Sequence, residues 1–151
     1  MKSTEAMRKN TVIVEEGVSV AEASMNMRQK GEGCAIILSK QGAPFGIITE
    51  RDVTWKVAAN GLDSKNVKVV EVMSTPLITV DPDVDLKEAA KLMKQHKIRR
   101  LAVVRKGFIY GVLTASDISH KLESYMDQER QDILRYLWTP QYYQATETGS
   151  V

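Results

Sequence analysis

The sequence predicts an α+β fold in which two β-α-β-β-α repeats pack with pseudo-two-fold symmetry and are followed by a C-terminal helix. Three observations support this fold class. A Gly-apolar-apolar-Thr-x-x-Asp motif occurs twice, each copy closes a pair of short apolar runs joined by a glycine-containing turn, and an amphipathic segment comes before each pair. Because a unit of about 55 residues buries too little surface to be stable alone, we expect the two repeats to share a core.

The internal repeat extends upstream of the motif. The two motif copies, 46–53 and 111–118, are offset by 65 residues. Farther upstream the offset is 66 residues, and the matching segments are 20–23 with 86–89 and 35–38 with 101–104. The difference is a one-residue insertion in the turn around Gly42 relative to the turn at Gly107. Hairpin turns tolerate such insertions, so the sequence predicts the same fold for both halves.

Each half begins with a β-rich run and an amphipathic helix. The β-rich runs are 11–14 and 77–80, and Asp81-Pro82-Asp83 after the second run is typical of a turn. In the helix of the second half, apolar residues recur at i, i+3, i+4 and i+7, namely Leu86, Ala89, Ala90 and Met93. This spacing predicts a helix with one buried face.

Each half continues with a β-hairpin and a second helix. The expected strand pairs are 35–38 with 45–48 and 101–104 with 108–113, joined through Gly42 and Gly107. The second helix begins near Glu50 in the first half and near Ala115 in the second half, and Asn60-Gly61 is a typical end for the first. The resulting boundaries are repeat one at 7–61, a connection at 62–76, repeat two at 77–122, and a C-terminal helix and loose tail at 123–151.

The C-terminal extension has an apolar stripe at near-heptad spacing, formed by Leu122, Met126, Ile133 and Leu137. A stripe of this kind usually packs against the body of its own chain or of a partner chain. Charged residues crowd the middle of the segment, which argues against insertion into a membrane.

Composition narrows the class of protein. The chain has 151 residues, 43% of them hydrophobic and 26% charged, with a formal net charge of +2. These values are ordinary for a globular protein and indicate neither a nucleic-acid nor a membrane partner. The first residues contain no apolar stretch typical of a secretory signal, so we expect a cytoplasmic location. One cysteine and two histidines at no ligand spacing predict no metal site, and no group of residues predicts catalysis; we expect a protein that is not an enzyme.

Thr49 with Asp52, and Thr114 with Asp117, lie where a strand turns into a helix. One interpretation is a capping box, in which threonine and the acidic residue satisfy backbone N–H groups of the first helical turn. The other is a ligand site, because a helix N-terminus attracts phosphate and a carboxylate can accept both hydroxyls of a ribose. Both interpretations use the same geometry.

Two arginines distinguish the second copy. Arg99 and Arg100 come just before the middle strand of repeat two, whereas repeat one has Gly33 and Cys34 at the matching place. Cations near a helix end can simply be solvated, but arginine also binds phosphate through paired hydrogen bonds. We therefore expect the Asp117 site to be the better phosphate site, and we expect Cys34 to begin a buried strand and to be inert.

The order β-α-β-β-α, repeated with Gly-apolar-apolar-Thr-x-x-Asp at the end of each half, resembles a stand-alone tandem pair of cystathionine-β-synthase (CBS) domains. Residues 72–80 also resemble the usual start of the second domain in that family. The resemblance covers about residues 7–122. The family often has proline in the middle strand, where this chain has Ile36 and Ala102.

The resemblance implies a regulatory, energy-sensing module that binds AMP, ADP or ATP, or else S-adenosylmethionine or a dinucleotide, in the cleft between the repeats. It implies no obligatory cofactor, a homodimer, and signalling by conformational change to an unidentified protein target. It implies contact of Asp117 and Asp52 with ribose, and of Thr114 and Thr49 with phosphate. The further residues that we expect to contact ligand are Arg99, Arg100, Ser116, Val112, Glu16, Ala21, Gly33, Arg51 and Ile47.

A nucleic-acid-binding protein is the alternative. The segment 94–106 holds six cations and no acid, namely Lys94, Lys97, Arg99, Arg100, Arg105 and Lys106. Against this hypothesis stand the near-neutral charge balance and the lack of interleaved aromatic residues.

Overall fold

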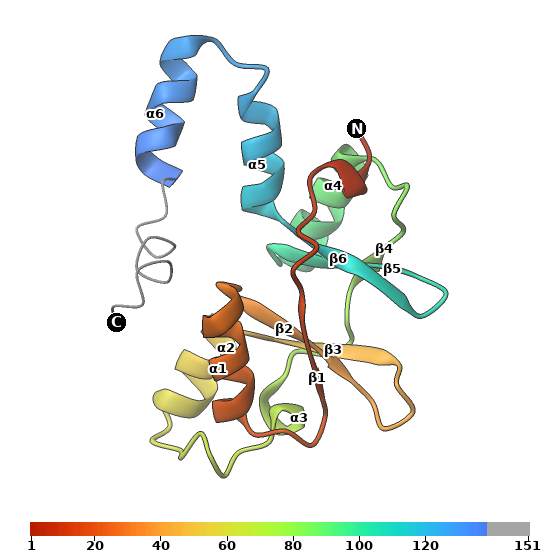
Figure 1. Ribbon diagram of the computed structural model, residues 1–151, viewed down its shortest axis with the longest axis vertical. Coiled ribbons are helices and arrows are strands. Elements are labelled where there is room, and N and C mark those ends of the chain that lie inside the picture. The colour runs from red at the N-terminus through yellow and green to blue at the C-terminus, as the bar shows by residue number, and fades with distance from the viewer. Residues whose placement is uncertain (139–151) are drawn as a thin grey trace.

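The structure is a computed structural model, and it describes residues 1–138. Two small three-stranded sheets lie one above the other, each with helices beside it (Figure 1). The first sheet consists of β1 (Val12–Glu15), β2 (Cys34–Leu38) and β3 (Pro44–Thr49), and the second of β4 (Thr79–Val80), β5 (Arg100–Arg105) and β6 (Phe108–Thr114). The helical elements are η1 (Ser3–Glu5), α1 (Val20–Lys30), α2 (Glu50–Asp52), η2 (Val53–Ala58), α3 (Val69–Val72), α4 (Leu86–His96), α5 (Ala115–Glu123) and α6 (Gln128–Trp138).

The two sheets have the same topology. In each, the first strand pairs in parallel with the second, and the second pairs antiparallel with the third. The register shifts between Ile37 and Leu38 in one sheet and between Val103 and Val104 in the other. Glycines with positive φ angles turn both hairpins, Gly42 at 82° and Gly107 at 76°. The predicted α+β fold of two equivalent repeats is thus confirmed.

The helix that follows the hairpin differs between the repeats. In repeat two, α5 begins at Ala115 as predicted and continues as an α-helix. In repeat one, α2 begins at Glu50 but changes after one turn into the π-helix η2, where the N–H of Ala59 donates to the carbonyl of Thr54. A π-turn widens the helix by one residue. The chain then leaves the helix in a turn that ends at Gly61, which has a φ of 65°.

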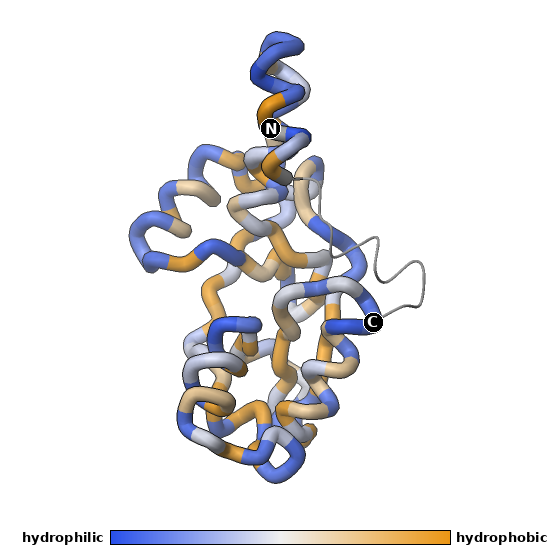
Figure 2. Tube along the Cα trace, turned by 90° about the vertical axis from the view of Figure 1, so that its left-hand side faces the viewer, coloured by the Kyte–Doolittle hydropathy of each residue, from blue (hydrophilic) through white to orange (hydrophobic). Residues whose placement is uncertain are grey.

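Each repeat has its own apolar core. The core of repeat one gathers around β1, α1 and β2, and the core of repeat two around β5, α4 and β6, as the orange strands in the middle of Figure 2 indicate. Leu86, Ala89 and Met93 are buried as expected for α4, whereas Ala90 is exposed. A third cluster joins the two sheets and consists of Cys34, Ile36, Ala102 and Val112. The shared core that we expected is this third cluster.

The segments that lead into the two repeats are exchanged between them. Residues 1–8 contact repeat two, where Arg8 forms an antiparallel bridge with Val112. Residues 69–74 contact repeat one, where Ser74 forms the equivalent bridge with Ile47. We call these the lead-in segments. They show that the 66-residue correspondence extends upstream to Arg8 and Ser74, and Ser74 lies before the start that we predicted for repeat two.

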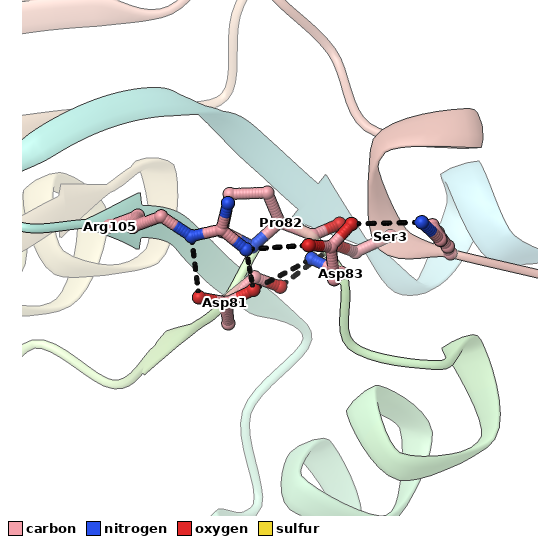
Figure 3. A network of polar contacts seen from close by, with 6 residues as sticks. Ser3, Asp81, Pro82, Asp83 and Arg105 are labelled. Atoms are coloured by element: carbon pink, nitrogen blue, oxygen red, sulfur yellow. Dashed lines mark hydrogen bonds and ion pairs between the residues drawn. The ribbon is translucent and has the colours of Figure 1, made fainter.

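A polar network holds the first lead-in segment on repeat two (Figure 3). The buried hydroxyl of Ser3 donates to the carbonyl oxygens of Asp81 and Pro82, at 3.2 and 2.9 Å. The guanidinium of Arg105 contacts the carboxylates of Asp81 and Asp83 at 2.5 and 2.6 Å. The segment therefore connects to the turn between β4 and α4 before it crosses to β1 (Figure 1).

The C-terminal helix α6 lies away from the two sheets (Figure 1). The predicted apolar stripe is divided between the end of α5, the connection after it and α6. Its four side chains are each at least 40% exposed, namely Leu122, Met126, Ile133 and Leu137. The expectation that the stripe packs against its own chain is therefore not met within residues 1–138. Packing against a partner chain stays a prediction, and the tail after residue 138 lies outside the described residues.

Candidate functional site

A cavity of about 740 Å³ lies between the two repeats. Repeat one contributes the C-terminal half of α1, the loop after it, the start of β2 and the α2–η2 helix, while repeat two contributes the start of β5 and the start of α5. The lining residues are Arg8, Ser24, Met27, Arg28, Gly31, Glu32, Gly33, Cys34, Glu50, Val53, Thr54, Arg100, Thr114 and Ser116. A volume of this size is in the range of small-molecule sites in proteins.

Asp117 does not line this cavity itself, but the capping box of α5 fixes it beside two residues that do. The backbone N–H of Thr114 donates to Oδ2 of Asp117 at 2.9 Å, and the backbone N–H of Asp117 donates to the hydroxyl of Thr114 at 3.0 Å. The carboxylate is buried, while Thr114 and Ser116 line the cavity. The capping box therefore holds an acidic group and a helix N-terminus together beside the cavity, as the sequence indicated.

Arg8 also contacts Asp117, and sequence reasoning missed this residue. Its Nε donates to Oδ1 of Asp117 at 2.9 Å, and its Nη1 lies 3.8 Å from Oε1 of Glu32. The lead-in segment brings Arg8 here from 109 positions away in the chain. The signal that could have revealed it is the match of Met7-Arg8 with Met73-Ser74 at the 66-residue offset.

Glu32 is a second acid in the cavity. Burial is the largest influence on this carboxyl and raises its pKa above the ordinary value, and the nearby Asp117 carboxylate acts in the same direction. Arg8 and Arg100 lower the pKa but do not cancel the effect of burial. The charge on Glu32 therefore depends on the cations that surround it.

Arg100 lies over Gly33, with its side chain in the cavity. A Cβ atom on Gly33 would come within 2.6 Å of Nη2 of Arg100 and 3.4 Å of Oε1 of Glu50. The glycine thus leaves room for the guanidinium, and Arg100 places a cation where the sequence predicted one.

Arg99 is not brought together with Arg100. It lines a different cavity of about 440 Å³ together with Lys94 and Lys97, and its backbone carbonyl accepts the N–H of Ala115 at 2.9 Å. Successive residues of an extended segment point to opposite sides. Only one residue of the arginine pair therefore faces the cleft between the repeats.

Asp52, the counterpart of Asp117, is surrounded by donors from its own repeat. The backbone N–H and the hydroxyl of Thr49 contact its Oδ2 at 2.9 and 3.1 Å. The hydroxyl of Ser74 contacts Oδ1 at 3.2 Å, and Nζ of Lys56 lies 2.9 Å from the same atom. Asp52 thus has a cation one turn along its own helix, whereas the cation at Asp117 comes from the lead-in segment.

The remaining sequence-predicted residues lie at varying distances from the cleft. Val112 and Ile47 contribute to the cluster between the sheets. Arg51 stacks on the ring of Trp55, 4.7 Å from its centroid, rather than lining the cavity. Glu16 and Ala21 also do not line it.

For Ala21 the reason is the orientation of α1, whereas Glu16 lies before this helix, directly after β1. Ala21 lies in its first turn, where its N–H donates to the carbonyl of Ser64. The part of α1 that reaches the cavity is one to two turns farther along, at Ser24, Met27 and Arg28.

Cys34 begins β2, as predicted, and forms part of the cavity wall. Burial raises the pKa of its thiol to about 11, although Arg100 acts in the opposite direction. The thiolate is therefore scarce at neutral pH, which agrees with an inert side chain.

Neither a metal-binding cluster nor a membrane-spanning helix occurs within residues 1–138. This part of the chain contains no group of three or more His, Cys, Asp or Glu side chains arranged to hold a metal ion. It also contains no helix with the length and apolarity needed to cross a membrane.

A family model described as the CBS domain matches the chain twice, at residues 4–58 and 69–124. The chain therefore belongs to the CBS-domain family and contains a tandem pair of these domains, which serve as regulatory modules. It is 36% identical over 115 residues to an uncharacterized protein of Methanopyrus kandleri, and the aligned region covers 76% of this chain and 59% of that relative. It is 34% identical to the CBS domain-containing protein YhcV of Bacillus subtilis, over 76% of this chain and 81% of that protein.

Solved structures show the same fold. A hexameric CBS-CP12 protein from bloom-forming cyanobacteria superposes with a TM-score of 0.76 and 34% identity, over 80% of this chain and 71% of that one. A CBS domain protein from Pyrobaculum aerophilum, solved in complex with AMP, superposes with a TM-score of 0.70 and 25% identity, over 78% of this chain and 89% of that one.

Proposed function

We propose that this protein is a regulatory module that binds an adenosine nucleotide in the cleft between its two CBS domains. The observation that carries the proposal is Asp117, a buried carboxylate fixed at the N-terminus of α5 and beside a cavity of nucleotide size. A carboxylate in this position suits the paired hydroxyls of a ribose. The first turn of α5 and the guanidinium of Arg100 suit a phosphate.

Both repeats would contact one ligand, because the cavity wall includes residues of each. A ligand that binds one relative orientation of the repeats better than another shifts the population toward it. A partner protein that contacts both repeats would then respond to the ligand. The solved AMP complex of a related CBS domain protein supports the choice of AMP as first test ligand. The hexameric relative supports assembly of this chain into an oligomer, and we propose a homodimer.

A thermal-shift panel of AMP, ADP, ATP, S-adenosylmethionine and NAD tests the proposal. A ligand present at 100 times its dissociation constant stabilises the folded state by about 2.7 kcal/mol, so at least one compound should raise the melting temperature. Guanosine and cytidine monophosphates are the matched controls. If no adenosine compound shifts the melting temperature at millimolar concentration, the proposed function is wrong.

The nucleic-acid alternative has less support because the cations of the segment 94–106 are divided. Arg105 pairs with Asp81 and Asp83, and Arg100 faces the cleft. Only Lys94, Lys97 and Arg99 are grouped around the second cavity. Titration with duplex DNA at two salt concentrations distinguishes the hypotheses, since DNA affinity falls with a slope of about −0.9 per neutralised phosphate in log salt and would not depend on Asp117.

A further inference from the structure

Arg8 and Ser74 occupy equivalent positions in the two lead-in segments, and each contacts the acidic residue of a capping box. The hydroxyl of Ser74 lies 3.2 Å from Oδ1 of Asp52. The guanidinium Nε of Arg8 lies 2.9 Å from Oδ1 of Asp117. The same place in the fold thus holds a neutral group in repeat one and a cation in repeat two.

Both oxygens of the Asp117 carboxylate have a partner, since Oδ2 accepts the backbone N–H of Thr114 and Oδ1 accepts Nε of Arg8. A ribose hydroxyl that donates to Oδ1 therefore competes with Arg8. The Asp117 side chain is 6% exposed and the Arg8 side chain is 34% exposed. Of the two partners, Arg8 is the more exposed, and it lines the cavity.

We propose that Arg8 is an exchangeable counter-ion that makes recognition of the adenosine moiety conditional on a phosphate. This inference rests on the proposed function of the cleft. When ribose hydroxyls bind Oδ1 of Asp117, hydrogen bonds from neutral donors replace an ion pair, and the guanidinium of Arg8 loses its carboxylate partner, which is unfavourable. A nucleoside has no phosphate that could bind the displaced guanidinium. A nucleotide brings a phosphate that accepts the displaced guanidinium through two parallel hydrogen bonds.

Arg8 therefore weakens nucleoside binding and strengthens nucleotide binding. Glu32 contributes to this balance, because its carboxylate lies 3.8 Å from Nη1 of Arg8 and keeps the guanidinium within the cleft. A lysine in the same place would carry the charge but not the paired donors.

The test is calorimetric titration of the full chain with adenosine and with AMP. Arg8→Ser copies the residue that repeat one has at this position. In this variant AMP should bind about tenfold more weakly, as expected for loss of a hydrogen bond to a charged group, while adenosine should bind more tightly than to the wild type. The preference for AMP over adenosine should thus fall by more than tenfold. Lys9→Ala removes the adjacent exposed cation and should leave both affinities unchanged.

Two results would overturn this inference without affecting the proposed function. Equal losses for AMP and adenosine in Arg8→Ser would show that Arg8 only supports the shape of the cleft, and unchanged affinities would show that it does not act on the ligand. Should Arg8→Ser not fold, as judged by circular dichroism, Arg8→Gln keeps a donor of similar length without the charge and carries the same expectations. If wild-type protein binds neither these two compounds nor any other adenosine compound of the thermal-shift panel, the proposed function fails and the inference fails with it.

Discussion

The backbone of Arg8 lies so close to Gly111 that a Cβ atom on this glycine would collide with the carbonyl oxygen of Arg8. The contact accompanies the bridge in which Arg8 and Val112 exchange two backbone hydrogen bonds. The glycine of the second Gly-apolar-apolar-Thr-x-x-Asp motif thus allows the lead-in segment to approach β6, and this approach places the Arg8 side chain beside Asp117.

Gly111→Ala should therefore destabilise the protein by about 1–3 kcal/mol, the usual cost of forcing extra volume into a packed region. The obstacle is backbone, which cannot move without breaking the bridge to Val112. Gly46→Ala is the control, because the equivalent Cβ would meet the flexible side chain of Met73 and should cost less. Urea unfolding of both variants measures the difference. A larger loss of stability in Gly46→Ala than in Gly111→Ala would contradict the prediction.

Asp117→Ala should weaken AMP binding more than Asp52→Ala does. Asp117 pairs with Arg8, which lines the cleft as Arg100 does, whereas Asp52 pairs with Ser74 and Lys56, which do not line it. Calorimetry on the two variants measures the difference, and thermal unfolding checks that both retain their fold. Equal losses, or a larger loss for Asp52→Ala, would show that the two sites do not differ as proposed.

Arg100→Ala and Arg99→Ala should differ, because only Arg100 faces the cleft. Replacing Arg100 should lower AMP affinity about ten- to a hundredfold, the range for a lost hydrogen bond to a charged group. Replacing Arg99 removes the same charge from the chain but should leave AMP affinity nearly unchanged. The neighbouring variant is thus a matched control, and a similar loss in both would mean that a general electrostatic attraction is responsible.

Arg105→Ala should raise the pKa of Asp81, which hydrogen bonds from Arg105 and from the backbone of Asp83 lower to about 2. A carboxyl group whose pKa is lower in the folded state stabilises the protein above its unfolded pKa of about 3.9. That stabilisation is lost as the pH falls through about 2. The stability of the variant should therefore depend less on pH in this range.

The pKa of Asp81 can be measured by NMR titration of its carboxyl carbon. Lys91→Ala, which breaks the exposed pair with Glu88, is the control and should leave the pKa of Asp81 unchanged. An Asp81 pKa that stays near 2 in Arg105→Ala would contradict the role of the ion pair.

The elements of the fold could be predicted because their signals are local. The turns at Gly42 and Gly107 need a positive φ angle that glycine adopts without strain. The capping boxes join residues three positions apart, such as Thr114 and Asp117, so a short motif contains the whole interaction. Duplication strengthened each of these predictions, since the same signals occur in both halves.

The candidate site could be predicted only in part. Thr114 and Gly33 line the cleft and Asp117 lies next to it, but Glu16 and Ala21 do not line it. No short motif states which turn of α1 faces the other repeat, so the position of Ala21 could not be predicted. Arg99 and Arg100 were treated as a pair, although the alternation of side chains along a strand separates them.

The sequence by itself determined the two repeats, their strands and turns, and the capping boxes that orient Asp52 and Asp117, because each depends on a few neighbouring residues. Only the tertiary structure decided which cation accompanies Asp117. Lys56 reaches Asp52 from one helical turn away, but Arg8 reaches Asp117 across 109 positions through the exchange of the lead-in segments. Contacts of that kind depend on how the repeats pack, and packing sums many weak interactions that no short motif records.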